Sequence, residues 1–147
     1  MADTILVPVD GSPLSKRAFE EALGDAESTV IAFHVIDPSD PGYSAPLDVD
    51  VSLEPLHGSS EWYEKAEQIA DEIFEELTAL ADGTGVDVET ETRRGDPARA
   101  IVEYAQDTDV DAIYVGSHGR SGETNLLLGS VAELVATRAP VSVTIVR

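Results

Sequence analysis

Cysteine is absent from this 147-residue chain, and positively charged side chains are scarce. Without cysteine, the chain can form neither disulfides nor thiolate metal sites, and it has no cysteine nucleophile. Only 9 Lys and Arg residues face 29 Asp and Glu residues, which gives a net charge of −20. Proteins hold nucleic acids through Lys and Arg at the phosphates, and anionic membranes attract basic segments. We therefore expect neither nucleic acid nor membrane as a partner.

Long apolar runs are also missing, since no run approaches the roughly 18 residues of a membrane span. The N-terminal residues "MADTILVPVDG" lack the charged and hydrophobic regions of a secretion signal. We therefore expect a cytoplasmic protein. The acidic residues are spread along the whole chain, so that salt would relieve their mutual repulsion, which favours a halophilic type of protein in a salt-rich cytoplasm. The length and the apolar fraction of 42% predict a single domain over residues 1–147.

Short apolar runs typical of buried strands alternate with patterns typical of helices with one apolar face. The predicted strands are 4–10, 28–36, 86–93, 111–116 and 141–147. The predicted helices are about 13–24, 62–80, 97–105 and 130–138. Because the connections are too long for hairpins, this order predicts an α/β fold with a parallel sheet and helices on both faces. A long loop insertion is expected at about 37–60, where four prolines occur without periodicity.

A loop with glycines at its start and end follows the fourth predicted strand, within "IYVGSHGRSGETNLLLGSVAELV". Ligands of open parallel sheets bind beyond the carboxyl ends of the strands, so we expect this loop to face "VDGS" of the first strand across a crevice. Gly116 and Gly119 would permit positive φ and a close approach of the backbone to a ligand. Gly129 would remove bulk where the next helix begins.

Ser130 and Glu133 match a capping box at the start of that helix. The free N–H groups of the helix are then expected from about Val131, aimed into the crevice, where they form an anion site that needs no lysine. Capping alone would also explain Ser130. The spacing is neither a P-loop nor a dinucleotide fingerprint, because the chain lacks both Gly-Lys-Ser/Thr and G-x-G-x-x-G.

The glycine and serine pattern resembles that of the nucleotide-binding branch of the universal stress protein family. The resemblance extends from "ILVPVDGS" through "GDPARAIVEYA" to "GSVAELVATRAPVSVTIVR". It implies a three-layer α/β/α fold of the Rossmann-like nucleotide α-hydrolase type, with a five-stranded parallel sheet in the order 3-2-1-4-5. It further implies a stress-response protein that binds ATP, or ADP or AMP, with any Mg²⁺ held by the phosphates.

The resemblance also implies, residue by residue, which side chains and backbone groups hold the nucleotide. Ribose and phosphates would lie against Gly116, Gly119, Arg120, Gly129, Ser130 and Val131. The adenosine side would lie against Pro8, Val9 and Asp10, with the backbone of Val35 at the adenine. Without the resemblance, Asp10 could equally accept backbone hydrogen bonds at a strand end.

Three functions remain open on these residues. The first is a nucleotide-dependent binding module for signalling in the stress response, because no residue set resembles a site for fast phosphoryl transfer. The second is a slow ATPase or autophosphorylating enzyme with Ser121 or Thr124 as acceptor. The third is a dimeric interaction module without nucleotide. A lone loop histidine such as His118 is more typical of a structural hydrogen bond than of a general base, and three scattered histidines indicate no metal site.

The C-terminal strand raises the possibility of assembly. Val141, Val143 and Ile145 line one face, and an unpaired apolar edge strand favours pairing with a second copy. The resemblance implies the same arrangement, a homodimer through residues 141–146. A covered or frayed terminus is the alternative.

Overall fold

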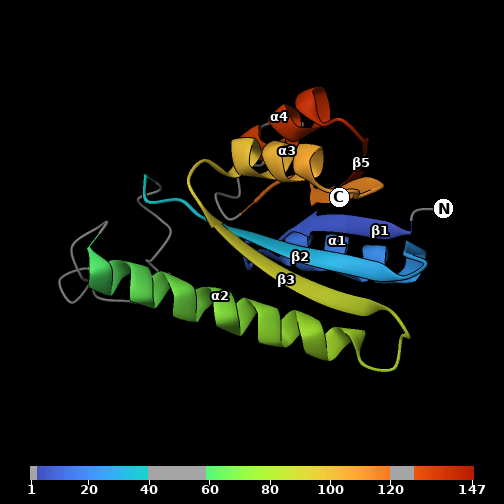
Figure 1. Ribbon diagram of the computed structural model, residues 1–147, viewed down its shortest axis with the longest axis horizontal. Coiled ribbons are helices and arrows are strands. Elements are labelled where there is room, and N and C mark those ends of the chain that lie inside the picture. Colours follow the sequence, from blue (N-terminus) through green and yellow to red (C-terminus); the bar gives the residue numbers. More distant parts are fainter. Residues whose placement is uncertain (1–2, 40–58, 120–127) are drawn as a thin grey trace.

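The computed structural model describes residues 3–39, 59–119 and 128–147, in which strands and helices alternate (Figure 1). The strands are β1 (Thr4–Pro8), β2 (Thr29–Ile36), β3 (Asp87–Arg94), β4 (Ala112–Gly116) and β5 (Ser142–Val146). The helices are α1 (Pro13–Asp25), α2 (Ser60–Ala81), α3 (Pro97–Asp107) and α4 (Ser130–Arg138).

All five strands pair in parallel in one sheet, as the sequence predicts, and their order β3-β2-β1-β4-β5 is the one that the family resemblance implies. The central strand β1 places Leu6 opposite Ile31 of β2 and Ile113 of β4. The strand order reverses beside β1, because the chain builds outward first through β2 and then through β4. A topological switch point of this kind leaves a crevice at the carboxyl ends of the strands.

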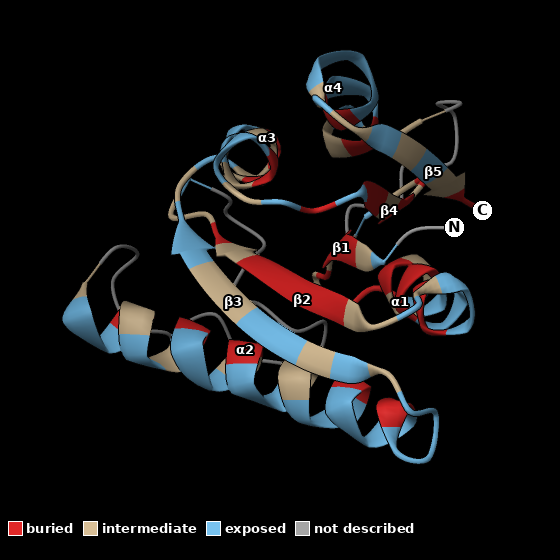
Figure 2. Ribbon diagram, turned by 45° about the vertical axis from the view of Figure 1, so that its right-hand side comes forward, coloured by how far each residue is buried: buried red, intermediate tan, exposed pale blue. Residues whose placement is uncertain are grey.

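The sheet is buried because apolar side chains leave its central strands on both faces. On one face, Val7 packs with Phe19 of α1 and Leu77 of α2. On the other face, Leu6 packs with residues of α3 and α4, including Ile101 and Val135. Figure 2 shows β2 buried along most of its length, whereas the edge strand β3 is mostly exposed or half-buried. The three layers of the predicted fold are therefore present.

Two predicted boundaries differ from the structure, and the first of them lies beside the crevice. The strand β1 ends at Pro8 rather than at residue 10, because the N–H of Asp10 turns away from the sheet to donate to the Ser15 hydroxyl (3.3 Å). The helix α1 continues through Gly24 to Asp25, and the N–H of Ala26 then donates to a carbonyl one turn earlier. Most of the predicted loop insertion, residues 40–58, lies outside the described residues.

Candidate functional site

A cavity of about 360 Å³ lies at the carboxyl ends of the strands, at the switch point of the sheet. The ends of β1, β2 and β4 line it together with the first residues of α3 and α4. Nine of the ten binding residues predicted from the sequence line this one cavity: Pro8, Val9, Asp10, Val35, Gly116, Gly119, Gly129, Ser130 and Val131. The tenth, Arg120, lies outside the described residues. Segments more than 100 residues apart thus meet around one space.

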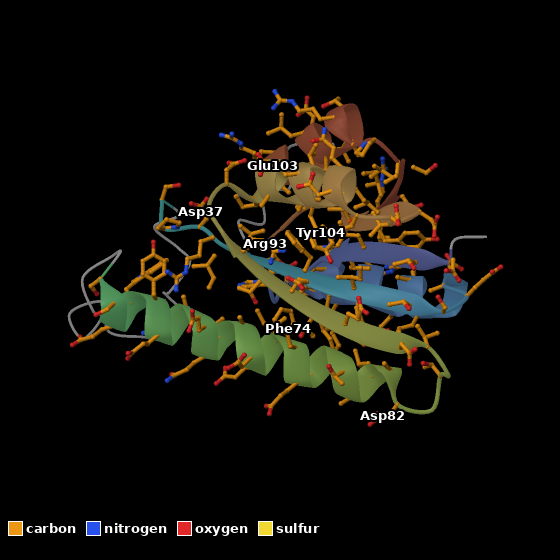
Figure 3. The ribbon with its side chains drawn as sticks, viewed as in Figure 1. Asp37, Phe74, Asp82, Arg93, Glu103 and Tyr104 are labelled. Carbon is orange, nitrogen blue, oxygen red and sulfur yellow. The ribbon has the colours of Figure 1, made fainter. Side chains whose placement is uncertain are left out.

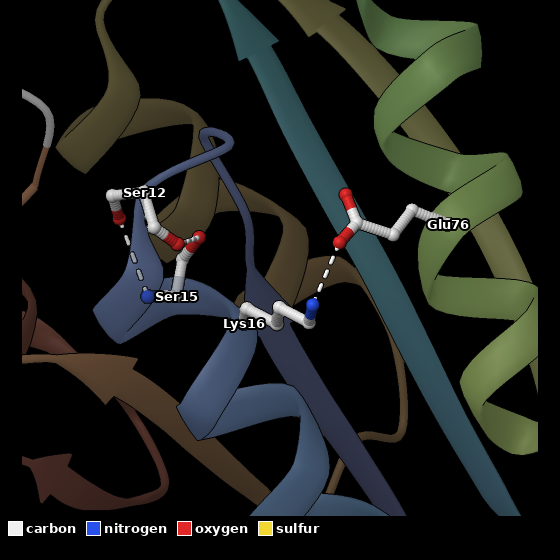
Figure 4. A network of polar contacts seen from close by, with 4 residues as sticks. All are labelled: Ser12, Ser15, Lys16 and Glu76. Carbon is white, nitrogen blue, oxygen red and sulfur yellow. Dashed lines mark hydrogen bonds and ion pairs between the residues drawn. The ribbon is translucent and has the colours of Figure 1, made fainter.

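Asp10 has a structural role and also faces the cavity. Its Oδ1 accepts a hydrogen bond from the N–H of Ser12 (2.9 Å), across a turn in which Gly11 has φ +84°. The Ser12 hydroxyl in turn accepts from the N–H of Ser15 (3.2 Å) and caps α1 (Figure 4). The turn therefore fixes the Asp10 carboxyl group at the cavity wall, where sequence alone left two roles open.

His34 fixes the residue before Asp10 and was not predicted as part of the site. Its side chain is buried, and its Nδ1 lies 2.7 Å from the carbonyl oxygen of Val9. Because a carbonyl oxygen only accepts, Nδ1 must carry the proton, which sets the tautomer of the ring. The N–H of Val9 donates to the carbonyl of Phe33 (2.8 Å). Both polar groups of the Val9 backbone are thereby held by β2.

The start of α4 differs from the predicted capping box. Its N-cap residue is Gly129, Ser130 is already the first helical residue, and no side chain among the described residues caps the helix. The prediction is wrong by one residue, because the N–H of Gly129 donates to the carbonyl of Ser117 (2.6 Å) and this bond sets where the helix begins. The first N–H groups of α4 therefore lie at the cavity, and within residues 3–39, 59–119 and 128–147 no side chain accepts from them as a cap.

By contrast, α1, α2 and α3 are capped by Ser12, Ser59 and Asp96. Free N–H groups at a helix N-terminus favour an anion. The cavity wall at α4 thus has the donors that an anionic ligand needs.

The glycines of the loop serve close packing rather than positive φ. Neither Gly116 nor Gly119 uses the positive φ that glycine permits, since the described glycines with positive φ are Gly11, Gly83, Gly85 and Gly95. A Cβ at Gly116 would lie 3.0 Å from Cβ of Leu14, which shows that this glycine lets α1 approach β4. A Cβ at Gly129 would lie 3.2 Å from the carbonyl oxygen of Ser117. Gly129 therefore removes bulk at the helix start, as predicted.

Two further carboxylates line the cavity, and the sequence analysis did not assign them to it. Asp37 follows β2, and Asp96 follows β3 by way of Gly95. Asp37 accepts hydrogen bonds from the N–H and the hydroxyl of Ser39 (2.9 and 2.6 Å), and Asp96 caps α3 by accepting from the N–H of Arg99 (3.0 Å). Position at a strand end, which identified Asp10, was a signal that could have found both.

Arg93, near the end of β3, already contacts its neighbours. Arg93 donates to Glu91 (2.6 Å), and its guanidinium lies 5.5 Å from the centre of the Tyr104 ring (Figure 3). Burial raises the pKa of Tyr104, and the charges of Glu91 and Glu89 raise it further, while Arg93 opposes them. Tyr104 packs on Phe33, which lines the cavity, and so contributes an uncharged ring beneath its wall.

Comparison with known proteins agrees with this geometry. The model of the universal stress protein family matches residues 1–147. The chain belongs to the universal stress protein family. It is 35% identical to universal stress protein MJ0531 of Methanocaldococcus jannaschii over 147 residues, which cover 97% of this chain and 81% of the relative.

Solved structures of similar proteins share the fold over nearly the whole chain. Hypothetical protein MJ0577 superposes with a TM-score of 0.81 at 28% identity, covering 98% of this chain and 94% of that protein. A universal stress protein in complex with cAMP superposes with a TM-score of 0.68 at 26% identity, covering 99% and 97%. Within the part of the chain that the structure describes, we find no helix long and apolar enough to cross a membrane.

Proposed function

We propose that this universal stress protein binds an adenine nucleotide in the cavity and acts as a nucleotide-dependent binding module in the stress response. The observation that carries the proposal is the N-terminus of α4, which no described side chain caps and which opens on the cavity at the switch point of the sheet. Such a terminus favours a phosphate group. The relative solved with cAMP supports an adenine ligand. ATP, ADP and AMP are the candidate ligands, with Mg²⁺ held by the phosphates when it is present.

In this proposal each wall of the cavity meets one part of the nucleotide. Phosphate accepts hydrogen bonds from the backbone N–H groups of α4, beginning at Ser130 and Val131. The carboxylate of Asp10 accepts hydrogen bonds from ribose hydroxyls, and the backbone of Val35 contacts the adenine. Gly116 and Gly119 border the phosphate and ribose, and Arg120 approaches the phosphates. The bound nucleotide would alter the surface around the cavity, which a partner protein in the cytoplasm could then recognise.

A slow ATPase or autophosphorylating activity is a second candidate. Ser121 and Thr124, the acceptors proposed from the sequence, lie outside the described residues. The loop histidine His118 pairs its Nδ1 with the hydroxyl of Ser117 (3.2 Å), and the backbone of Ser117 is in turn bonded to β5 and to Gly129. These bonds favour a structural role for His118 over the role of a general base. They therefore favour a binding module over an enzyme. Incubation with γ-labelled ATP separates the two, because the enzyme releases or retains labelled phosphate.

We also propose a homodimer through β5. This strand is an edge of the sheet, Val143 and Ile145 are half-buried under the α4 face, and the family resemblance implies this interface. Light scattering should give twice the mass of 15.6 kDa, and proline at Val143, whose N–H faces away from β4, should yield the monomer. A monomeric wild type would refute the interface. An interaction module without nucleotide remains the third candidate.

The decisive experiment is to denature freshly purified protein and to identify released small molecules by mass spectrometry. We expect an adenine nucleotide from the wild type. Gly129→Val should release none, because even a Cβ at this residue crowds the Ser117 carbonyl and the helix start. Gly24→Val is the matched control, since nothing lies within 4 Å of a Cβ there. A wild type that carries no nucleotide and binds none when it is added would refute the proposal.

A further inference from the structure

We infer that this cavity selects its ligand by charge, and that it binds nucleoside monophosphates more tightly than triphosphates unless cations screen the phosphates. The inference rests on the proposed function, since it concerns which nucleotide the same cavity prefers. It follows from the side chains around the cavity and from the small positive charge that the backbone can offer.

Three carboxylates line the cavity: Asp10, Asp37 and Asp96. None of the described lining residues is Lys or Arg. The three come from the loops after three neighbouring strands, β1, β2 and β3, so each of these loops contributes one carboxylate to the cavity. Each further phosphoryl group on a ligand adds negative charge near this wall. Asp10 and Asp37 are half-buried, so their repulsion of a ligand is screened less than that of the exposed Asp96, and the cost of binding grows with the number of phosphates.

The basic residues closest in sequence to these loops are already paired with carboxylates. Lys16 of α1 contacts Glu76 of α2 (2.7 Å), as Figure 4 shows, and Arg94 contacts Glu67 (3.0 Å). Arg99 contacts Glu103 (3.0 Å). The charge of each cation is thus offset at short range and adds little to the potential in the cavity.

The sequence of the segments outside the described residues does not reverse this balance. Residues 40–58 contain no Lys or Arg, and residues 120–127 contain one arginine, Arg120. The same two segments contain five acidic residues, Asp40, Asp48, Asp50, Glu54 and Glu123. Even if Arg120 reached the cavity, it would stand alone against the three lining carboxylates.

Among the described residues, the backbone supplies less positive charge than one phosphate group carries as negative charge. The N-terminus of α4 is equivalent to roughly half an elementary positive charge, and Glu133 in the first turn of the helix offsets part of it. The other helix that starts at the cavity, α3, is capped by the carboxylate of Asp96, which offsets its dipole. The 5′-phosphate of a monophosphate can occupy the α4 terminus, whereas a triphosphate must place two more charged groups beyond it.

The test is calorimetric titration of nucleotide-free protein with AMP and with ATP, in metal-free buffer of low ionic strength. We expect AMP to bind about tenfold more tightly than ATP, which corresponds to about 1.4 kcal/mol. Raising the salt from about 0.1 to about 1 M, which shortens the Debye length from ~10 to ~3 Å, should narrow the difference. Addition of Mg²⁺ to ATP should narrow it as well.

Charge variants test whether the lining carboxylates cause the preference. Asp37→Asn and Asp96→Asn should each strengthen ATP binding roughly threefold relative to AMP, the size of a weak ion-pair effect. Asparagine keeps the acceptor oxygen that the Ser39 turn and the α3 cap require, so both variants should fold. The matched control is Asp82→Asn, which changes the net charge equally at the end of α2 distant from Asp37 (Figure 3). Asp82→Asn should leave the ratio of the ATP and AMP affinities unchanged.

The outcomes separate this inference from the proposed function. ATP binding as tightly as AMP or more tightly in metal-free buffer overturns the charge selection and leaves nucleotide binding in place. An equal effect of Asp82→Asn and Asp37→Asn also overturns it, because the preference would then reflect net charge alone. Binding of neither AMP nor ATP overturns both proposals.

Discussion

The carboxylate of Asp10 occupies the place that a side chain at Gly119 would need. An ideal Cβ at Gly119 would lie 2.7 Å from Oδ2 of Asp10, closer than real Cβ contacts come. The two residues belong to the loops after β1 and β4, which border the cavity from neighbouring strands. The glycine thus lets the carboxylate stay at the wall where we place the ribose. In this position glycine serves the geometry of another residue of the site.

Gly119→Ala should weaken nucleotide binding while leaving stability nearly unchanged. The atom that must move is the free end of the Asp10 side chain rather than backbone, so the fold can adapt at little cost. A displaced carboxylate would lose its bond to the ribose, and we expect the dissociation constant to rise about tenfold. Calorimetric titration measures the affinity, and urea denaturation measures the stability. Unchanged affinity would contradict the role we give Asp10.

Gly116→Ala, unlike Gly119→Ala, should lower the stability of the protein, and it should do so in the absence of any ligand. Its Cβ would lie 3.0–3.2 Å from Cβ, C and O of Leu14, so the backbone of α1 would have to shift. Overpacking of this kind typically costs about 1–3 kcal/mol. Gly24→Ala is the control in the same helix α1, where a Cβ meets nothing within 4 Å and alanine should stabilise by about 0.5–1 kcal/mol. Urea denaturation at equal temperature compares the two.

These contrasts explain what the sequence could predict and what it could not. Alternation of apolar runs and amphipathic segments is a local signal, so the strands and helices were predicted nearly to their ends. The presence of glycines near the cavity was also readable. The reason for these glycines could not be predicted, because crowding by Leu14 or Asp10 depends on contacts between segments about 100 residues apart. Gly116 and Gly119 would permit positive φ, but the close packing around them is what requires glycine there.

The same limit applies to the rest of the site. Gly129 and Ser130 both suit an N-cap, and only the bond from Gly129 to Ser117 decides between them. Asp37 and Asp96 carry the strand-end signal, yet their place beside Asp10 requires the order of the strands. Local pattern gives no such order, and the family resemblance supplied it.

His34→Phe should destabilise the protein and weaken nucleotide binding together. Phenylalanine fills a similar volume but leaves the Val9 carbonyl without its Nδ1 donor, and an unsatisfied buried acceptor costs about 1–3 kcal/mol. The end of β1 would loosen, and Asp10, the next residue after Val9 in the chain, would lose its fixed position. His34→Asn offers an amide donor that can bond the same carbonyl and should recover part of both losses. Full stability in His34→Phe would show that the bond contributes little.

Tyr114→Phe should remove a pH-dependent contribution to stability. The Tyr114 hydroxyl donates to Oδ2 of Asp25 (2.5 Å), and this bond raises the pKa of Tyr114, with burial and the charge of Asp25 adding to it. A raised pKa stabilises the fold below the ordinary tyrosine value near 10 and loses that contribution as pH rises through the folded value. We expect the wild type to exceed the variant by about 0.5–1 kcal/mol at pH ~8 and by less at pH ~11.

Urea denaturation at the two pH values measures the difference. Asp25→Asn is the control for charge, because it keeps an acceptor but removes the carboxylate that holds the proton. It should lower the pH at which the tyrosine contribution is lost. A difference between wild type and Tyr114→Phe that does not change with pH would mean that only packing is affected.

Salt should raise the stability of this protein, and the sign of the effect decides which electrostatic force dominates. The described ion pairs, such as Lys16–Glu76 and Arg94–Glu67, join exposed side chains, and pairs of this kind contribute about 0–1 kcal/mol each. Repulsion within a net charge of −20 acts on the whole surface. If ion pairs dominated, salt would destabilise the fold by screening them. We expect repulsion to dominate, so the free energy of unfolding in urea should rise between about 0.1 and 3 M NaCl.

The double variant Glu72→Gln, Glu75→Gln, which removes two exposed charges of α2, should be more stable at low salt and less sensitive to salt. Stability that falls with added salt would contradict this expectation and assign the larger role to the ion pairs.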